Sequence, residues 1–195
     1  INYRVSYVEA AGFEKVPDDM AGFLKCCKAL KAKGYPTGFA LGHAVGDANT
    51  WTHWFLWSFG GKAVEADGKT IAINSKETLQ ALETAKEFYE TMAPSVEAWF
   101  DPHNNKAFLE GRISLTANGN SIFYASMNKF PEINKDLMTM NFPVGPVGRP
   151  TELSLFSLAF VFKHTPVPNA AKHYLRFMFE APQYGEWEAG TWGFV

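Results

Sequence analysis

Two short stretches of the sequence place carboxylate, amide and hydroxyl side chains directly beside aromatic rings. Their candidate contact residues are Asp47, Asn49, Thr50 and Trp51 in the first, and Asn118, Asn120, Ser121, Phe123 and Tyr124 in the second. Sugars present apolar C–H faces that stack on aromatic rings, and hydroxyls that bond to amides and carboxylates. Each stretch lies where a loop meets the start of an expected helix, so backbone N–H groups are also free for a ligand. The two stretches therefore predict a binding site for a polyhydroxylated small molecule.

Not every aromatic residue of the first stretch can serve that site. On one helix Trp51, Trp54, Phe55 and Trp57 cannot all face the same side. Trp54 and Phe55 are expected in the core, whereas Trp51, in the first turn beside the polar loop, is the candidate that faces a ligand. Asn120 has two open interpretations, as a helix cap or as a ligand contact.

Sequence motifs of nucleotide-binding proteins and of common hydrolases are absent. The chain has no Walker loop, G-x-G-x-x-G turn, G-x-S-x-G elbow or H-E-x-x-H helix. His43 and Asp47 have three open interpretations: a metal or acid–base pair, a plain polar loop contact, or solvent-exposed residues. Asp101 and Glu110 are candidates for the carboxylate pair of a carbohydrate-active enzyme, but their separation is not fixed by the sequence. No catalytic residue, metal site or cofactor is predicted, and a binding protein is favoured over an enzyme.

The two cysteines are neighbours, Cys26 and Cys27. Adjacent cysteines rarely bridge each other, and two thiols without further Cys or His residues do not make a metal site. The apolar spacing around them is helical, which predicts Cys27 in the core and Cys26 at its flank.

The elements that must position these residues follow an alternating pattern. Short strands are expected near residue 1 and over 36–41, 70–73, 112–116, 138–142 and 153–162. Helices are expected over 17–33, after Thr50, from Ser75 to Pro94, from Asp101, after Asn120 and over 169–179. This alternation predicts an α/β fold. The Pro- and Gly-rich stretch 143–150 is the expected linker between residues 1–142 and 151–195.

Composition narrows the classes of function. The 195 residues are 47% hydrophobic and 19% charged, which is typical of a globular protein. The formal net charge is −2 with both signs scattered along the chain, so a nucleic-acid partner is not expected. Apolar runs fall short of the ~20 residues that span a membrane. Aromatic residues make up 15% of the chain, more than a core of this size needs, so some are expected to line a binding surface.

The order of several motifs resembles a known family. The matching stretches run through residues 9–17, 23–34, 54–61, 67–69, 74–82, 107–115, 119–120, 143–148, 169–177 and 192–194. Together they resemble the extracellular solute-binding proteins of bacterial ABC importers, in the sugar-binding branch that includes maltose-binding protein. No single piece is specific, but their order and spacing cover nearly the whole chain.

The resemblance implies a periplasmic-binding-protein-like fold with two α/β lobes and ligand held between them. By this alignment the chain contains mainly the C-terminal lobe (1–142) and, from 151, a segment that returns to the N-terminal lobe and starts the third crossing. A signal peptide, part of the N-terminal lobe and the C-terminal helices would then lie outside it. The implied protein is a monomer that delivers a sugar or polyol to membrane-spanning permease subunits. It would be periplasmic or extracellular, either free or membrane-anchored.

Site residues carry over by position. In relatives the loop before the tryptophan-rich helix contacts ligand, which here points to Asp47, Asn49, Thr50 and Trp51. The turn after the 112–116 strand often carries a stacking aromatic residue, but here Asn120 and Ser121 take that place, with Phe123 and Tyr124 close behind. The loop near the third crossing adds Trp192 and Phe194. An anionic or peptide solute is the alternative ligand, and the nominated loops of residues 1–142 contain no Lys or Arg to meet an anion.

Overall fold

The computed structural model describes residues 1–153 and 158–191. The chain divides into two compact units, Ile1–Leu153 (unit 1) and Ser154–Val195 (unit 2). The sequence predicts a linker at 143–150, but this stretch belongs to unit 1. Its first half is held there by hydrogen bonds. Val144 N–H donates to Asp18 O at 2.8 Å, and the carbonyl of Pro143 accepts from Trp54 Nε1 at 2.9 Å. The boundary therefore lies after residue 153.

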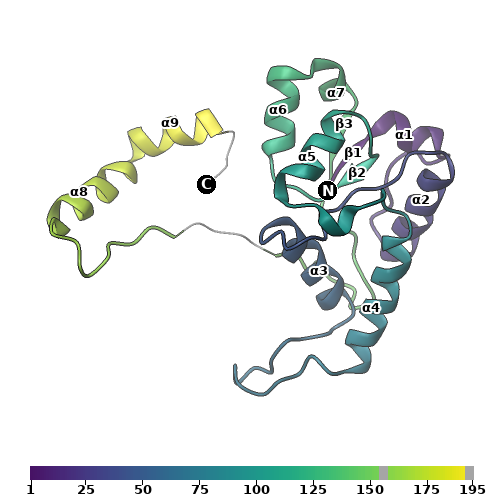
Figure 1. Ribbon diagram of the computed structural model, residues 1–195, viewed down its shortest axis with the longest axis horizontal. Helices are drawn as coiled ribbons and strands as arrows, with labels where there is room; N and C mark the ends of the chain where they lie inside the picture. Colours follow the sequence, from purple (N-terminus) through teal and green to yellow (C-terminus); the bar gives the residue numbers. More distant parts are fainter. Residues whose placement is uncertain (154–157, 192–195) are drawn as a thin grey trace. The chain divides into compact units, whose positions relative to one another are not determined.

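Unit 1 contains a small three-stranded antiparallel sheet. Strand β1 (Asn2–Arg4) lies between β2 (Leu115–Thr116) and β3 (Leu137–Thr139), with Tyr3 paired to Leu115 on one side and Met138 on the other. The helices of unit 1 are α1 (Val5–Ala10), α2 (Met20–Ala32), α3 (Asp47–Ser58), α4 (Lys76–Tyr89), α5 (Asp101–Leu109), α6 (Ser121–Lys129) and α7 (Pro131–Lys135), with a short 3-10 turn at Val96–Ala98. In Figure 1, α3 and α4 lie below the sheet. The mixed α/β class predicted from the sequence is confirmed.

Local signals in the sequence set several helix boundaries. Asp19 accepts a hydrogen bond from Gly22 N–H at 2.9 Å at the start of α2, and Ser75 accepts one from Thr78 N–H at 3.2 Å at the start of α4. Helix α3 begins at Asp47 instead of after Thr50, because Gly46 precedes it and Asp101 supplies the acceptor for its first N–H. The predicted strands at 36–41 and 70–73 were wrong: each segment makes only an isolated bridge, Thr37 with Met92 and Val64 with Ile71.

The core of unit 1 is built around Phe88 of α4. This fully buried ring makes edge, tilted or stacked contacts with four other rings, at centroid distances of 4.9–5.9 Å; they are Phe23, Phe39, Trp51 and Phe55. Trp54 and Phe55 lie in the core as expected. Cys27 does as well, but Cys26 was wrongly placed at a flank, since both thiols are fully buried and unpaired. Burial raises the pKa of the Cys26 thiol to about 11.

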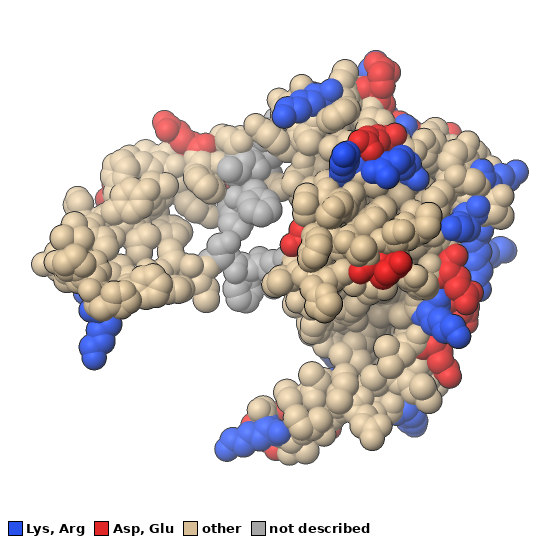
Figure 2. Space-filling model, viewed as in Figure 1, with Lys and Arg blue, Asp and Glu red and all other residues tan. Residues whose placement is uncertain are grey.

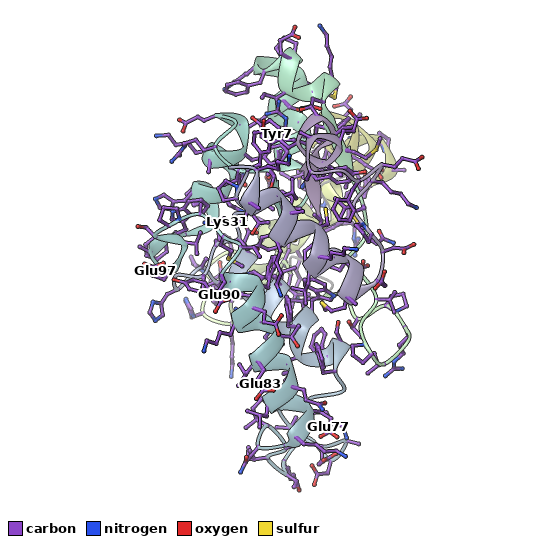
Figure 3. All side chains as sticks on the ribbon, turned by 90° about the vertical axis from the view of Figure 1, so that its right-hand side faces the viewer. Tyr7, Lys31, Glu77, Glu83, Glu90 and Glu97 are labelled. Carbon is purple, nitrogen blue, oxygen red and sulfur yellow. The ribbon has the colours of Figure 1, made fainter. Side chains whose placement is uncertain are left out.

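Helix α4 turns a charged face outward. Figure 3 looks onto this side of unit 1 and shows Glu77, Glu83 and Glu90 following one another along the helix. Leu79 and Leu82 of α4 are also more than half exposed. Figure 2 shows acidic and basic side chains intermixed over unit 1 on the face drawn there.

A partly buried ion pair joins the start of the chain to residue 136. Arg4 Nε donates to Asp136 at 2.7 Å, and Ser6 donates to the same carboxylate through its backbone N–H and its hydroxyl. Desolvation acts to raise the pKa of Asp136, but the hydrogen bonds from Ser6 and Arg4 outweigh it, so the pKa lies below its usual value.

Replacing Asp136 should therefore destabilise unit 1. We expect Asp136→Ala to lower the free energy of unfolding by about 2 kcal/mol at pH 7, because Arg4 and Ser6 lose their acceptor. The contribution of Asp136 is present above its unfolded pKa and lost as the pH falls through its lowered folded pKa. Urea unfolding at pH 7 measures the loss; an unchanged midpoint in Asp136→Ala would contradict the role given to the pair.

Unit 2 contains two described helices, α8 (Pro168–Met178) and α9 (Ala181–Thr191). Pro168 occupies the first turn of α8, and the helix expected over 169–179 is present. Helix α8 is amphipathic, and its aromatic residues Tyr174 and Phe177 are 61% and 45% exposed. The predicted strand at 153–162 lies partly outside the described residues, and its described parts, residue 153 and residues 158–162, are not strands.

Candidate functional site

Asp47 is the centre of a polar cluster in unit 1. It stands at the start of α3, where α5 and the turn between β2 and α6 also meet. Its Oδ2 accepts hydrogen bonds from two amides, Asn104 Nδ2 at 2.7 Å and Asn118 Nδ2 at 3.1 Å. Among the described residues its Oδ1 has no hydrogen-bond donor. One carboxylate oxygen is thus held by the protein, and the other remains as an acceptor.

The amides are themselves fixed by further contacts. Asn104 is fully buried on α5 and also donates to the carbonyl of Ala117 at 3.0 Å. Asn118 donates to Asn105 Oδ1 and accepts from Ser121 Oγ at 2.7 Å. Asn105 Nδ2 in turn donates to Ser121 Oγ at 3.3 Å. The cluster of Asp47, Asp101, Asn104, Asn105, Asn118 and Ser121 is named the amide–carboxylate cluster below.

Asp101, at the start of α5, adds a second carboxylate. Its Oδ1 accepts a hydrogen bond from the Asp47 backbone N–H at 2.9 Å. The Asp101 carboxylate therefore lies at the first turn of α3, where the helix dipole favours a negative charge. The pKa of Asp47 rises to about 6: desolvation raises it most, the hydrogen bond from Asn104 opposes this, and the charge of Asp101 adds to the rise. Asp47 therefore changes its charge in the pH range in which many proteins work.

The other predicted residues of the first stretch lie apart from this cluster. Asn49 is exposed and donates to Val45 O at 2.8 Å, while the Thr50 hydroxyl donates to Gly46 O at 2.8 Å. Trp51 is 2% exposed, and its indole N–H donates to Ala40 O at 2.8 Å. Its ring packs on Phe39 and Phe88, because position 51 faces the core one turn after Asp47. The sequence predicted that Trp51 would offer its ring to a ligand, whereas the structure buries this ring in the core of unit 1.

The second stretch is placed at the start of α6. Asn120 is the residue before the helix and makes no side-chain cap bond, so the helix-cap interpretation was wrong. Ser121 is exposed and belongs to the cluster. Phe123 is half-buried, and Tyr124 is 43% exposed in the first turn of the same helix. Trp192 and Phe194 lie outside the described residues.

Sequence reasoning missed Asn104 and Asn105. The available signal was their position on α5, since Asn104 shares a helix face with the buried residues Ala107 and Phe108. An asparagine on an apolar helix face must find partners, because an unsatisfied buried amide costs about 1–3 kcal/mol. The partner itself could not be named, because Asp47 is distant in the sequence.

The alternative carboxylate pair does not form. Asp101 and Glu110 stand at opposite ends of α5, roughly 13 Å apart along its axis at ~1.5 Å per residue, beyond the ~5–9.5 Å of glycosidase pairs. Glu110 is bonded to Arg112 at 2.7 Å. In the part of the chain that the structure describes, no three His, Cys, Asp or Glu side chains are grouped to hold a metal ion.

An apolar pocket of about 600 Å³ lies between α3 and α4. It is lined mainly by aliphatic and aromatic side chains, including Leu56, Ile73, Leu82 and Tyr89. Trp51 also lines this pocket, whereas no residue of the amide–carboxylate cluster does. Its lining suits an apolar contact and not a polyhydroxylated ligand.

Comparison with known proteins identifies the family. The model of the bacterial extracellular solute-binding proteins matches residues 1–195. The chain belongs to this family. Its members are binding proteins and not enzymes. No curated protein matched this solute-binding chain.

Solved structures share the fold of this solute-binding chain at low sequence identity. Maltose-bound MalE3 of T. maritima is 21% identical with a TM-score of 0.74; the match covers 93% of this chain and 48% of MalE3. A solute-binding protein of Thermotoga lettingae TMO bound with α-D-tagatose is 16% identical, with a TM-score of 0.76 and coverages of 97% and 49%. A sugar transporter of Arthrobacter chlorophenolicus A6 with laminaribiose is 21% identical, with a TM-score of 0.68 and coverages of 89% and 43%.

These matches show a periplasmic-binding-protein fold present in part. The chain spans about half the length of these relatives. None of the helices in the described residues has both the length and the apolar composition needed to cross a membrane.

Proposed function

We propose that this chain belongs to the substrate-binding component of an ABC importer that binds a neutral sugar or polyol. The observation that carries this proposal is the chemistry of the amide–carboxylate cluster. It contains two carboxylates, three amides and one hydroxyl, and among the described residues no Lys or Arg bonds to it. Such groups suit hydroxyls that both donate and accept, and they disfavour an anion.

The proposed contacts divide into polar and stacking groups. Asp47 Oδ1 and the exposed Ser121 are the polar contacts of the cluster. Tyr124, in the first turn of α6, supplies an exposed ring for the apolar face of a sugar. Asn49, Thr50, Asn120, Phe123, Trp192 and Phe194 remain predicted contacts on the resemblance. Trp51 is proposed only as a core support for the start of α3.

The three related structures support the same ligand class, since they were solved with maltose, α-D-tagatose and laminaribiose. The protein would work as a monomer in the periplasm or outside the cell, free or membrane-anchored. It would deliver its solute to the membrane-spanning permease subunits of the importer. Binding would occur without chemical turnover.

A thermal-shift screen tests this function. The panel contains maltose, laminaribiose, D-tagatose and glycerol, with inorganic phosphate, L-glutamate and a tripeptide as the contrasting class. It is run on this 195-residue chain and on the product of its full reading frame. A ligand at 100 times its Kd stabilises a one-site protein by about 2.7 kcal/mol, which visibly raises the midpoint.

We expect at least one sugar or polyol to raise the midpoint of the full product, and the anions and peptide to leave it unchanged. A rise with phosphate, glutamate or the tripeptide alone would overturn the neutral ligand and keep the fold. No rise with any compound in the full product would contradict the proposed binding of these solutes. The exposed Lys62→Ala variant, on the turn after α3, serves as a control that should behave as the parent does.

A further inference from the structure

Asn104 is a fully buried polar residue whose hydrogen bonds connect three parts of unit 1. It stands on α5, donates to Asp47 at the start of α3, and donates to Ala117 after β2. Its own Oδ1 accepts Asn105 N–H at 2.9 Å. Asn118 approaches the same oxygen of Asp47 from the turn before α6. The two amides thus bind one oxygen from two sides.

We propose that Asn104 and Asn118 are positioning residues that keep Asp47 ionised with Oδ1 directed to the ligand, so that binding of a neutral hydroxyl ligand weakens when Asp47 takes up a proton. This inference rests on the proposed function and deepens it. Asp47 Oδ1 is the acceptor for the ligand, and Asn104 and Asn118 hold the other oxygen, Oδ2, in place.

The electrostatic surroundings make the amides necessary. Asp101 of α5 is the charged group that acts on Asp47, and it opposes ionisation; the turn 117–121 contributes the neutral Asn118 and Ser121. Burial opposes ionisation as well, and the pKa of Asp47 stands near 6 in consequence. Amide donors stabilise only the charged form of a carboxylate strongly, so removing one raises that pKa further.

A protonated Asp47 would present the ligand with a different group. Its charge is lost, and a charge-assisted hydrogen bond becomes a neutral one of roughly half the strength. If the ligand requires the ionised form, its affinity falls about tenfold from pH 7 to pH 5 for a group with a pKa near 6. A positioning role therefore has a pH signature that a purely structural role lacks.

The first measurement needs no ligand. The ¹³C resonance of the Asp47 side-chain carboxyl is followed by NMR from pH 3 to pH 9, with Asp47→Asn to assign it. We expect a midpoint near 6 in the parent, and a midpoint higher by about one pH unit in Asn104→Ala and in Asn118→Ala. Asn128→Ala removes an exposed amide that donates to Tyr124 O and not to Asp47, so its midpoint should equal that of the parent.

Asn118 is half-buried, so its variant keeps the test valid if the cavity left at position 104 unfolds the chain; circular dichroism checks each variant. A midpoint near 4 in the parent, or an unchanged midpoint in a folded Asn118→Ala, would overturn the proposal.

The second measurement is the Kd for maltose, laminaribiose and D-tagatose by calorimetry at pH 5, 6, 7 and 8, with the full product. We expect the Kd of the sugar that binds to rise at pH 5, and this rise to begin at higher pH in Asn118→Ala. A Kd independent of pH in both proteins would refute the coupling. If no sugar binds, the proposed function fails, while the NMR midpoints still decide whether the amides position Asp47.

Discussion

Phe88→Ala should lower the free energy of unfolding of unit 1 by about 4 kcal/mol, a large loss for a single truncation. The ring is fully buried and touches four other rings that come from α2, α3 and the segment before α3. Alanine removes these contacts and leaves a cavity that rigid neighbours cannot fill. Urea unfolding, followed by tryptophan fluorescence, measures the loss.

The next residue provides a matched control. Tyr89 lies on the same helix, loses a similar ring in Tyr89→Ala, and is 41% exposed with one bond of 3.3 Å to Glu97. The change in helix propensity is nearly equal at the two positions, so the difference between the variants reports burial. We expect Tyr89→Ala to cost at most about 1 kcal/mol. Equal losses at 88 and 89 would show that Phe88 is not the centre of the core.

Asp47→Asn should weaken ligand binding and, at pH 8, make the protein more stable. The variant keeps an oxygen for the two amides but offers the ligand an NH₂ group in place of an anionic acceptor. A lost hydrogen bond to a charged group is worth about 1.5–3 kcal/mol, so we expect a Kd higher by roughly 10- to 150-fold. Calorimetry with the sugar selected by the screen measures this change.

The gain in stability follows from the sign of the pKa shift. The pKa of Asp47 is raised from 3.8 to about 6 on folding, so the folded chain binds a proton more tightly than the unfolded chain. The ionised carboxylate therefore reduces stability, fully above pH 6 and not at all below pH 4. Because the group is partly exposed, Asp47→Asn should gain only about 1 kcal/mol at pH 8.

Asp67, a carboxylate whose pKa is lowered instead of raised, serves as the control. The pKa of Asp67 is lowered to about 2 by hydrogen bonds, first from the Thr70 hydroxyl and then from the backbone of Lys69 and Thr70. Its stabilising effect is present above pH 4, so Asp67→Asn should slightly destabilise the chain at pH 8. A loss of stability in Asp47→Asn at pH 8 would contradict the burial of that charge.

Much of the fold could be predicted from local signals. The caps Asp19 and Ser75, and the stop at Gly34 with φ of +86°, act through neighbours close in sequence, and the corresponding helices were predicted correctly. The strands at 36–41 and 70–73 were wrong because an apolar run does not say whether a neighbouring strand is available to pair with it.

The site was predictable only in part, because its contacts are distant along the chain. Asp47 and Ser121 were named from their residue types beside aromatic rings, and the structure places both in one cluster. Asn104 was missed because its partner, Asp47, is supplied by another element. The burial of Trp51 could not be predicted, because α3 carries several aromatic residues and their spacing leaves open which rings face the core.

The central claim is that a neutral sugar binds at the amide–carboxylate cluster, and hydrogen–deuterium exchange tests it most directly. The full product is measured with and without saturating maltose, laminaribiose or D-tagatose, and peptides covering 44–50 and 117–124 are compared with those covering α4. We predict slower exchange in 44–50 and 117–124 with the sugar that binds, and no such change in Asp47→Asn at the same concentration. Slower exchange confined to the pocket between α3 and α4, or equal protection in Asp47→Asn, would contradict the account.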